Sequence, residues 1–170
     1  MLISAVAFPD VILALHILGA IVGFGSVFVF PVMFAAASRS DPAVIPWLLR
    51  VRQRVGRFVI NPGLTVVVAA GIYLASDEHQ WGNFYVGWGI VAALVLGALE
   101  GNLIIRPAGR LATLAERDLA ATAVPAGGQR TSATWSPEYA MALRRFSLAG
   151  NAMALIVVLT VFFMATHLGA

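Results

Sequence analysis

The residue best suited to chemistry in this sequence is His16. It lies within an apolar stretch, residues 11–37, that contains no Asp, Glu, Lys or Arg. An ionisable side chain in such a stretch indicates function by default, and neutral imidazole is a good ligand for haem iron. On a helix His16 shares one side with Gly19 and Gly23, because three and seven steps approximate whole turns. These glycines would let a flat macrocycle lie close to the backbone, so the pattern favours a b-type haem with His16 as its iron ligand.

A second axial ligand is needed for most haems of this kind, and His167 is the candidate. Paired histidines from two helices are a common way to hold haem in a helical bundle. His167 ends the last apolar stretch, residues 147–167. Two other interpretations of His16 stay open. It is a structural histidine hydrogen-bonded to a neighbouring helix, or it takes part in metal binding or proton transfer.

A separate group of polar residues surrounds Glu100, near the end of the apolar stretch 84–105. A carboxylate buried alone would tend to protonate, so we expect Glu100 to pair with Arg57 or Arg145 across helices. Asn61 and Asn151 complete the group. The group is either a polar clamp that fixes the bundle or part of a proton or ion pathway.

Most catalytic signatures are missing from the sequence. Without cysteine it has no disulfide, iron–sulfur cluster or thiolate metal site. It also has no P-loop, no GxSxG and no HExxH motif. Phosphoryl, acyl and nucleic-acid chemistry therefore lack support, no catalytic residue is identified, and whether the protein is an enzyme stays open.

The elements that must position these residues are four apolar stretches. The chain has 170 residues, of which 60% are hydrophobic and 11% are charged, whereas a soluble domain is about a quarter charged. A helix needs about 20 apolar residues to cross a bilayer. The stretches that meet or approach this length are residues 11–37, 58–75, 84–105 and 147–167. The sequence therefore predicts an all-α, polytopic membrane four-helix bundle that forms a single domain over residues 1–170.

The arginines predict the orientation of this bundle. The chain has no lysine, and all eleven arginines fall within two predicted loops, residues 38–57 and 106–146. The positive-inside rule puts both loops in the cytoplasm and the N and C termini outside. Within the first loop, Trp47 and its apolar neighbours alternate with Arg50, Arg52 and Arg54, which predicts an interfacial helix leading into the second span.

Two stretches carry a family resemblance. ALHILGAIVGFGSVFVFPVMF, which contains His16, and RFVINPGLTVVVAAGIYL resemble the first two spans of small four-helix bacterial integral membrane proteins allied to the CopD copper-resistance and HemJ protoporphyrinogen-oxidase families. The resemblance implies a four-helix membrane fold in the bacterial cytoplasmic (inner) membrane and haem contact at His16. It does not extend to oxidase activity. The lysine of HemJ-type proteins is missing, and Gly150-Asn151-Ala152 replaces their Asn-Glu-Pro.

These observations favour a small membrane protein that binds haem b in the outer half of the bundle in a redox-associated role. One alternative is a non-enzymatic structural or accessory subunit, which packs against a second copy or a larger membrane complex. A small proton-coupled transporter that uses Glu100 is the other. The expected partner is the lipid bilayer rather than nucleic acid, because the arginines flank the apolar stretches.

Overall fold

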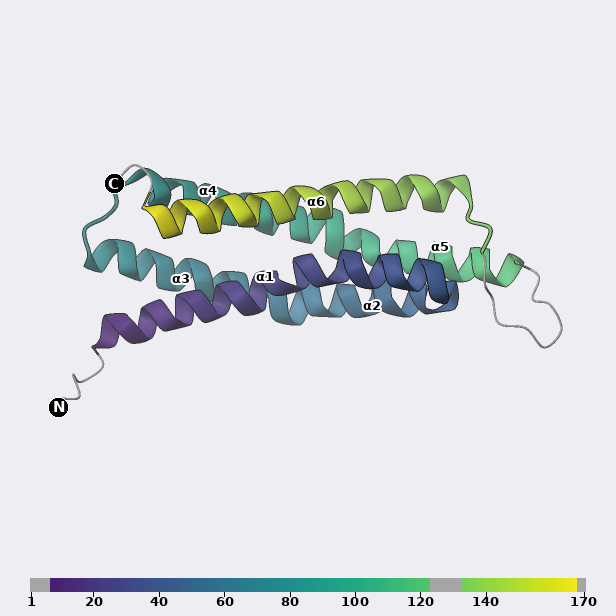
Figure 1. Cartoon of the computed structure of the whole chain (residues 1–170), viewed down its shortest axis with the longest axis horizontal. Coiled ribbons are helices and arrows are strands. Elements are labelled where there is room, and N and C mark those ends of the chain that lie inside the picture. Colours follow the sequence, from purple (N-terminus) through teal and green to yellow (C-terminus); the bar gives the residue numbers. More distant parts are fainter. Residues whose placement is uncertain (1–6, 123–132, 168–170) are drawn as a thin grey trace.

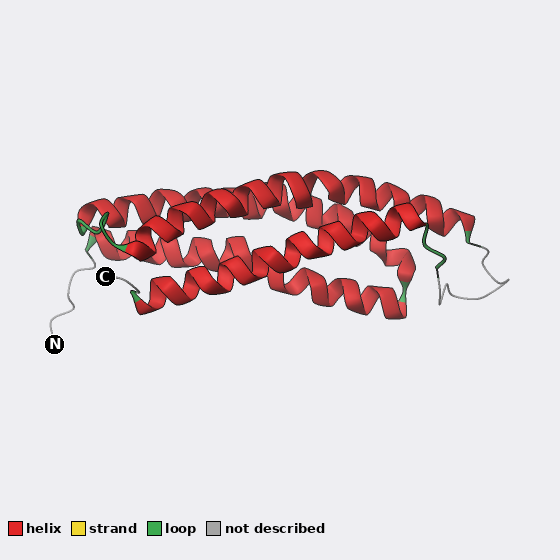
Figure 2. Cartoon of the chain, turned by 90° about the horizontal axis from the view of Figure 1, so that it is seen from above, coloured by secondary structure: helices red, strands yellow, loops and turns green. Residues whose placement is uncertain are grey.

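The computed structural model describes residues 7–122 and 133–167, and within these residues every regular element is helical (Figures 1 and 2). The chain forms four long rods. The first is α1 (Phe8–Ser40), and a short 3-10 turn, η1 (Pro42–Val44), leads from it into the second. The second rod consists of α2 (Ile45–Val55), the π-turn η2 (Gly56–Ile60) and α3 (Asn61–Asp77). The third consists of α4 (Phe84–Leu99), the π-turn η3 (Glu100–Ile105) and α5 (Arg106–Ala121), and the fourth is α6 (Pro137–Thr166).

Each rod is long and apolar enough to cross a membrane, which confirms the four predicted apolar helices. With η1 counted in the second rod, the rods contain 33, 36, 38 and 30 residues. At about 1.5 Å per residue they measure roughly 45–57 Å, whereas the hydrocarbon core of a bilayer is about 30 Å thick. The helices therefore continue well beyond any apolar layer, through much of the two segments predicted as loops.

The second rod is helical from Ile45 to Asp77. The sequence predicts an interfacial helix around Trp47 that leads into the second span, and in the structure this helix, α2, continues into α3 without a break. The reason lies in the π-turn η2, where the Asn61 N–H donates to the carbonyl of Gly56, five residues back. A proline ring clashes with the carbonyl four residues earlier in a regular α-helix. The wider turn directly before Pro62 makes room for that ring, so the helix passes through the proline.

The third rod repeats this arrangement. In η3 the Arg106 N–H donates to the carbonyl of Gly101, again five residues back, and Pro107 follows at once. The two π-turns contact each other across the bundle. Wide turns of this kind occur frequently at functional sites, and here two of them bring the middles of the second and third rods together.

The rods pack in pairs. The largest contacts join α1 to α3, α2 to α5, and α4 to α6. In the first pair the backbones approach closely at glycines. A methyl group on Gly63 would lie 2.9 Å from the Cα of Gly23, and one on Gly19 would lie 3.0 Å from Val67. Small residues at such crossings let helices come together in membrane proteins.

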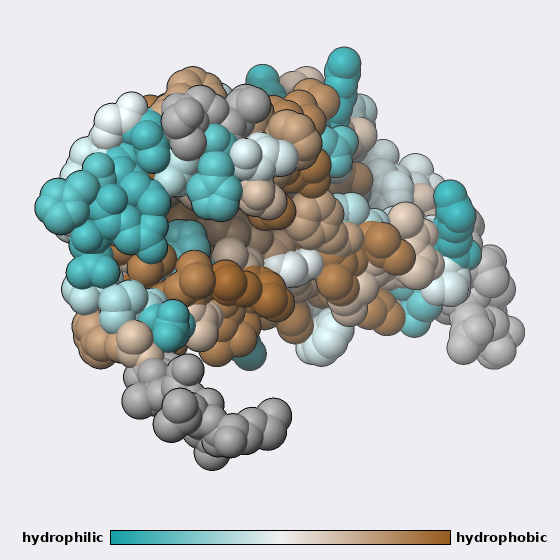
Figure 3. All heavy atoms as spheres, turned by 60° about the vertical axis from the view of Figure 1, so that its left-hand side comes forward, coloured by the Kyte–Doolittle hydropathy of each residue, from teal (hydrophilic) through white to brown (hydrophobic). Residues whose placement is uncertain are grey.

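Two buried clusters hold the rods together. One lies among the more apolar halves of the helices and consists of Phe24, Val27, Leu96, Ile104, Ala149, Met153 and Val157. The other lies at the arginine-rich end and consists of Ile45, Leu49, Leu111, Ala112, Leu114, Ala115 and Tyr139. Many large apolar side chains face outward instead, among them Val32, Phe58 and Leu94, and apolar residues run across the middle of the face in Figure 3. An exposed apolar surface of this extent suits a multi-pass membrane protein.

Candidate functional site

A buried ion pair joins the second and third rods beside the two π-turns. Arg52 of α2 donates from Nη1 to Oε1 of Glu100 and from Nη2 to Oε2, both over 2.7 Å. Arg52 is 4% exposed and Glu100 only 1%. Paired, parallel hydrogen bonds of this kind are the strong form of the arginine–carboxylate interaction. The two charges cancel within the bundle, which lets both groups stay away from water.

Glu100 does pair with an arginine of another helix, but the predicted partners were wrong. Arg57 and Arg145 are both exposed, and Arg52 takes their place. Arg52 lies four positions after Leu48 and three after Leu49, two buried leucines of α2, so it shares their inward face. Arg57 is five positions further along and points outward. The spacing of Arg52 from the leucines was the signal that sequence analysis missed.

The ion pair is enclosed tightly. The ring of Phe30 lies over the guanidinium of Arg52, with its centroid 5.3 Å from Cζ, a geometry in which the aromatic face attracts the cation. Gly56 fits against the carboxylate because it has no side chain. A Cβ there would lie 2.5 Å from Oε1 of Glu100 and 2.7 Å from Ile105. The pair therefore depends on α1 as well as on the two rods that it joins.

A pocket of about 330 Å³ opens between α1 and α6, and Arg52 contributes to its lining. Its walls are largely apolar and include three phenylalanine rings, and its polar groups other than Arg52 come mainly from α6. The residues that define it are Phe30, Phe34, Phe146, Ser147 and Asn151, together with Arg52. This volume lies at the small end of the roughly 300–1,000 Å³ typical of ligand pockets. The pocket thus joins an apolar wall to a buried charged group.

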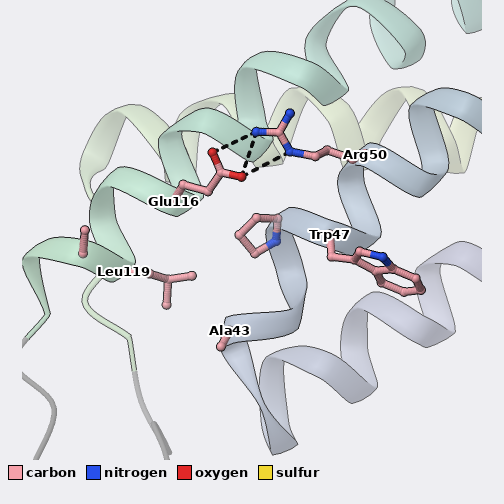
Figure 4. A pocket seen from close by; sticks show the side chains of 7 residues that line it. Ala43, Trp47, Arg50, Glu116 and Leu119 are labelled. Carbon is pink, nitrogen blue, oxygen red and sulfur yellow. Dashed lines mark hydrogen bonds and ion pairs between the residues drawn. The ribbon is translucent and has the colours of Figure 1, made fainter.

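A second, shallower pocket of about 520 Å³ lies at the arginine-rich end between α2 and α5 (Figure 4). There Nη2 of Arg50 contacts both carboxylate oxygens of Glu116 at 2.8 Å, and Trp47 lies to one side. Both charged side chains are about half exposed. Solvent screens such pairs, and they contribute little energy. This surface therefore lacks the buried charged group that the pocket beside Arg52 contains.

His16 contacts the helix beside it. Its Nδ1 lies 2.8 Å from the carbonyl oxygen of Val67 in α3, and its ring packs against Gly71. A carbonyl only accepts hydrogen bonds, so Nδ1 is the donor, and in the neutral imidazole Nε2 then has the lone pair. The glycine face predicted for a macrocycle, Gly19 and Gly23, is covered by α3. A haem does not fit against these glycines, because the helix fills the space that they leave.

The structure places the ring of His167 against α4. His167 ends α6 in the left-handed conformation, with a φ of 48°, and its ring meets the edge of Tyr85 in α4 at 5.3 Å between centroids. No described contact brings His16 and His167 together. The described residues also contain no group of three or more His, Asp or Glu side chains that could hold a metal ion.

Polar contacts at the arginine-rich end fasten α5 to the start of α6. Asp118 accepts from the backbone N–H of Ser136 at 2.8 Å and from Arg117 at 3.2 Å, and the Ser136 hydrogen bond is the main reason that its pKa is lowered. Nearby, burial and then the charge of Asp118 raise the pKa of Tyr139 to about 12. The Tyr139 hydroxyl is buried and has no hydrogen-bond partner among the described residues.

The other predicted polar residues do not join the ion pair. Asn61 is exposed on α3. Asn151 is exposed on α6, yet it lines the pocket beside Arg52. Of the five residues predicted as a polar clamp or ion site, two lie near Arg52. Glu100 forms the ion pair with Arg52, and Asn151 lines the pocket that Arg52 also lines.

Comparison with protein-family models, curated proteins and solved structures found no match to this chain. The resemblance to the CopD and HemJ families therefore stays a prediction. Evidence for function comes from the ion pair and the pocket themselves.

Proposed function

We propose that this protein is a membrane protein that binds a small amphipathic molecule in the pocket between α1 and α6. The supporting observation is that the lining of one pocket combines a nearly fully buried arginine, Arg52, with aromatic walls. Ligand pockets typically consist of apolar and aromatic walls with a few polar groups that orient the ligand. The apolar body of the ligand would lie against Phe34 and Phe146, and its polar end would face Arg52.

The proposed placement is the cytoplasmic membrane of a bacterium, with α1 beginning and α6 ending outside. The described arginines support it, because they lie in α2, η2, α5 and the adjoining ends of α1 and α6, opposite the α3–α4 connection (Figure 1). Such an excess of positive charge marks the cytoplasmic side. The pocket would then lie near the cytoplasmic boundary of the membrane, and a ligand would enter sideways from the bilayer.

Filling the pocket tests this proposal. Ala35 and Ala36 are neighbouring exposed residues of α1, but only Ala35 lines the pocket. The protein in lipid nanodiscs would be labelled with a photoreactive long-chain alcohol, and the labelled residues mapped by mass spectrometry. We expect labelling to concentrate on the pocket, to fall severalfold in Ala35→Phe, and to persist in Ala36→Phe. Equal labelling of all outward-facing apolar residues, unchanged by Ala35→Phe, would exclude the proposal.

A haem role for His16 is a second candidate, and one observation favours it. Histidines that bind a metal usually donate their other ring N–H to a carbonyl or carboxylate, and His16 donates Nδ1–H to the carbonyl of Val67. Only Nε2 would face the iron, from the side that α3 does not cover. The visible spectrum of the purified protein tests this. A Soret band lost in His16→Ala would support haem, and a folded, colourless wild-type protein would exclude it. The accessory-subunit and transporter alternatives stay predictions.

A further inference from the structure

We infer that the ligand of the α1–α6 pocket presents a neutral hydrogen-bond acceptor to Arg52, and that it is a membrane quinone. This inference rests on the proposed function and specifies the chemical class of its ligand. The first reason is charge. Arg52 and Glu100 already neutralise each other through two hydrogen bonds of 2.7 Å, and both are buried. An anion that accepted from Arg52 would place a second negative charge beside the buried carboxylate of Glu100, with only one cation to neutralise both, which is unfavourable. A neutral ligand leaves the ion pair intact.

The second reason is the number of donors on Arg52. Glu100 accepts one hydrogen bond from each terminal nitrogen. Nε–H and the second N–H of each terminal nitrogen remain, and none of them has a partner among the described residues. These N–H groups are therefore free to donate to a further acceptor. Because Arg52 lines the pocket, a carbonyl oxygen in that space is well placed to accept one of these hydrogen bonds.

The third reason is the shape and polarity of the walls. The rings of Phe34 and Phe146 lie 6.3 Å apart at 54°, and Phe30 covers the guanidinium from α1. Such walls suit a flat ring. Ser147 and Asn151 lie one helical turn apart on α6 and line the same pocket. A planar ring with carbonyl groups at opposite ends could accept from Arg52 at one end and from Asn151 at the other. A quinone has this pattern, and its apolar tail could leave between α1 and α6.

Calorimetric titration of the protein in nanodiscs, with empty nanodiscs as the blank, tests the inference. The probes are a decyl-substituted benzoquinone, decylbenzene of the same tail length, and decanoate. Two added hydrogen bonds should make the quinone bind about tenfold tighter than decylbenzene. Asn151→Leu should weaken quinone binding by about 3- to 10-fold and leave decylbenzene binding unchanged. Asn102→Leu, at an exposed asparagine that is not among the residues lining the pocket, is the matched control and should change neither.

The outcomes separate the inference from the proposed function. If quinone and decylbenzene bind equally and the photoreactive alcohol still labels the pocket, the inference of a quinone ligand is wrong. The proposal that the pocket binds an amphipathic molecule would still stand. Tighter binding of decanoate than of quinone would overturn the neutral acceptor in favour of an anion. Binding of no probe, together with a pocket that is not labelled, would refute both. The double variant Arg52→Gln/Glu100→Gln removes both charges together and should lose the preference for quinone over decylbenzene.

Discussion

Gly56→Ala is the substitution that challenges the geometry of the buried ion pair most directly. The new methyl group would lie 2.5 Å from Oε1 of Glu100, 2.7 Å from Cγ1 of Ile105 and 3.1 Å from Nη1 of Arg52. The carboxylate cannot move aside freely, because Arg52 holds both of its oxygens. The added methyl must therefore push the two rods apart or open the ion pair.

The expected cost follows from these two possibilities. Overpacking a core costs about 1–3 kcal/mol, and opening a buried ion pair costs about 3–5 kcal/mol. Alanine is about 1 kcal/mol more favourable than glycine within a helix, which offsets part of either cost. With the pair opened, we expect Gly56→Ala to lower the free energy of unfolding by about 2–4 kcal/mol. If the rods only shift, the loss falls to about 2 kcal/mol or less.

Unfolding in mixed micelles with a rising fraction of sodium dodecyl sulfate, followed by circular dichroism, would measure the change. Gly101 provides a matched control, because it belongs to the other π-turn and a Cβ there would meet nothing within 4 Å. We expect Gly101→Ala to be neutral or stabilising by up to about 1 kcal/mol. Equal stability of the two variants would refute the close approach of Gly56 to the ion pair.

Three further results are expected. Gly63→Ala should destabilise the protein by about 1–3 kcal/mol in the same assay, because its methyl would meet the backbone of Gly23 at 2.9 Å, whereas Gly25→Ala faces open space and should not. The pKa of Asp118 is lowered in the folded protein, so its contribution to stability is present above the unfolded pKa near 3.8 and is lost as the pH falls through the lower folded pKa. Asp118→Asn should therefore flatten the acid side of a plot of melting temperature against pH. An unchanged plot would contradict this role of Asp118. Tyr139, with its pKa raised from 10.0 to about 12, holds its proton longer in the folded state than in the unfolded state. Stability should therefore fall as the pH rises from about 10 towards 12, and Tyr139→Phe should remove both this loss and the late step in ultraviolet tyrosinate absorbance.

The sequence predicts the four apolar helices because uncharged stretches of membrane-spanning length are unambiguous. It does not predict where the helices end, since polarity marks the limit of an apolar layer and not the limit of a helix. In α2 the buried residues Ile45, Leu48, Leu49 and Arg52 keep helical spacing into the span. Arg52 lies on the same helical face as Leu48 and Leu49, whereas Arg50 and Arg54 are exposed. Assigning each arginine to a face of the helix would therefore have distinguished Arg52 from the other two.

The partners of the candidate residues could not be predicted, because they depend on how separate helices align. The sequence indicates that one side of α1, with His16, Gly19 and Gly23, accepts a close neighbour. Only the alignment of α1 with α3 shows that this neighbour is a helix, with Gly63 opposite Gly23. The pocket is a similar case, because it lies between parts of α1 and α6 that are distant in the chain.

The ion pair also has a consequence for the order in which the protein assembles. Arg52 is synthesised 48 residues before Glu100, which at roughly 5–20 residues per second is an interval of about 2–10 s. Gly23 and Gly63 fall before or early in that interval, so α1 and α3 can pack while Arg52 still lacks its acceptor. Arg52 must spend this time in contact with water or lipid headgroups. Only once Glu100 is present can Arg52 form the buried ion pair, which joins the second and third rods.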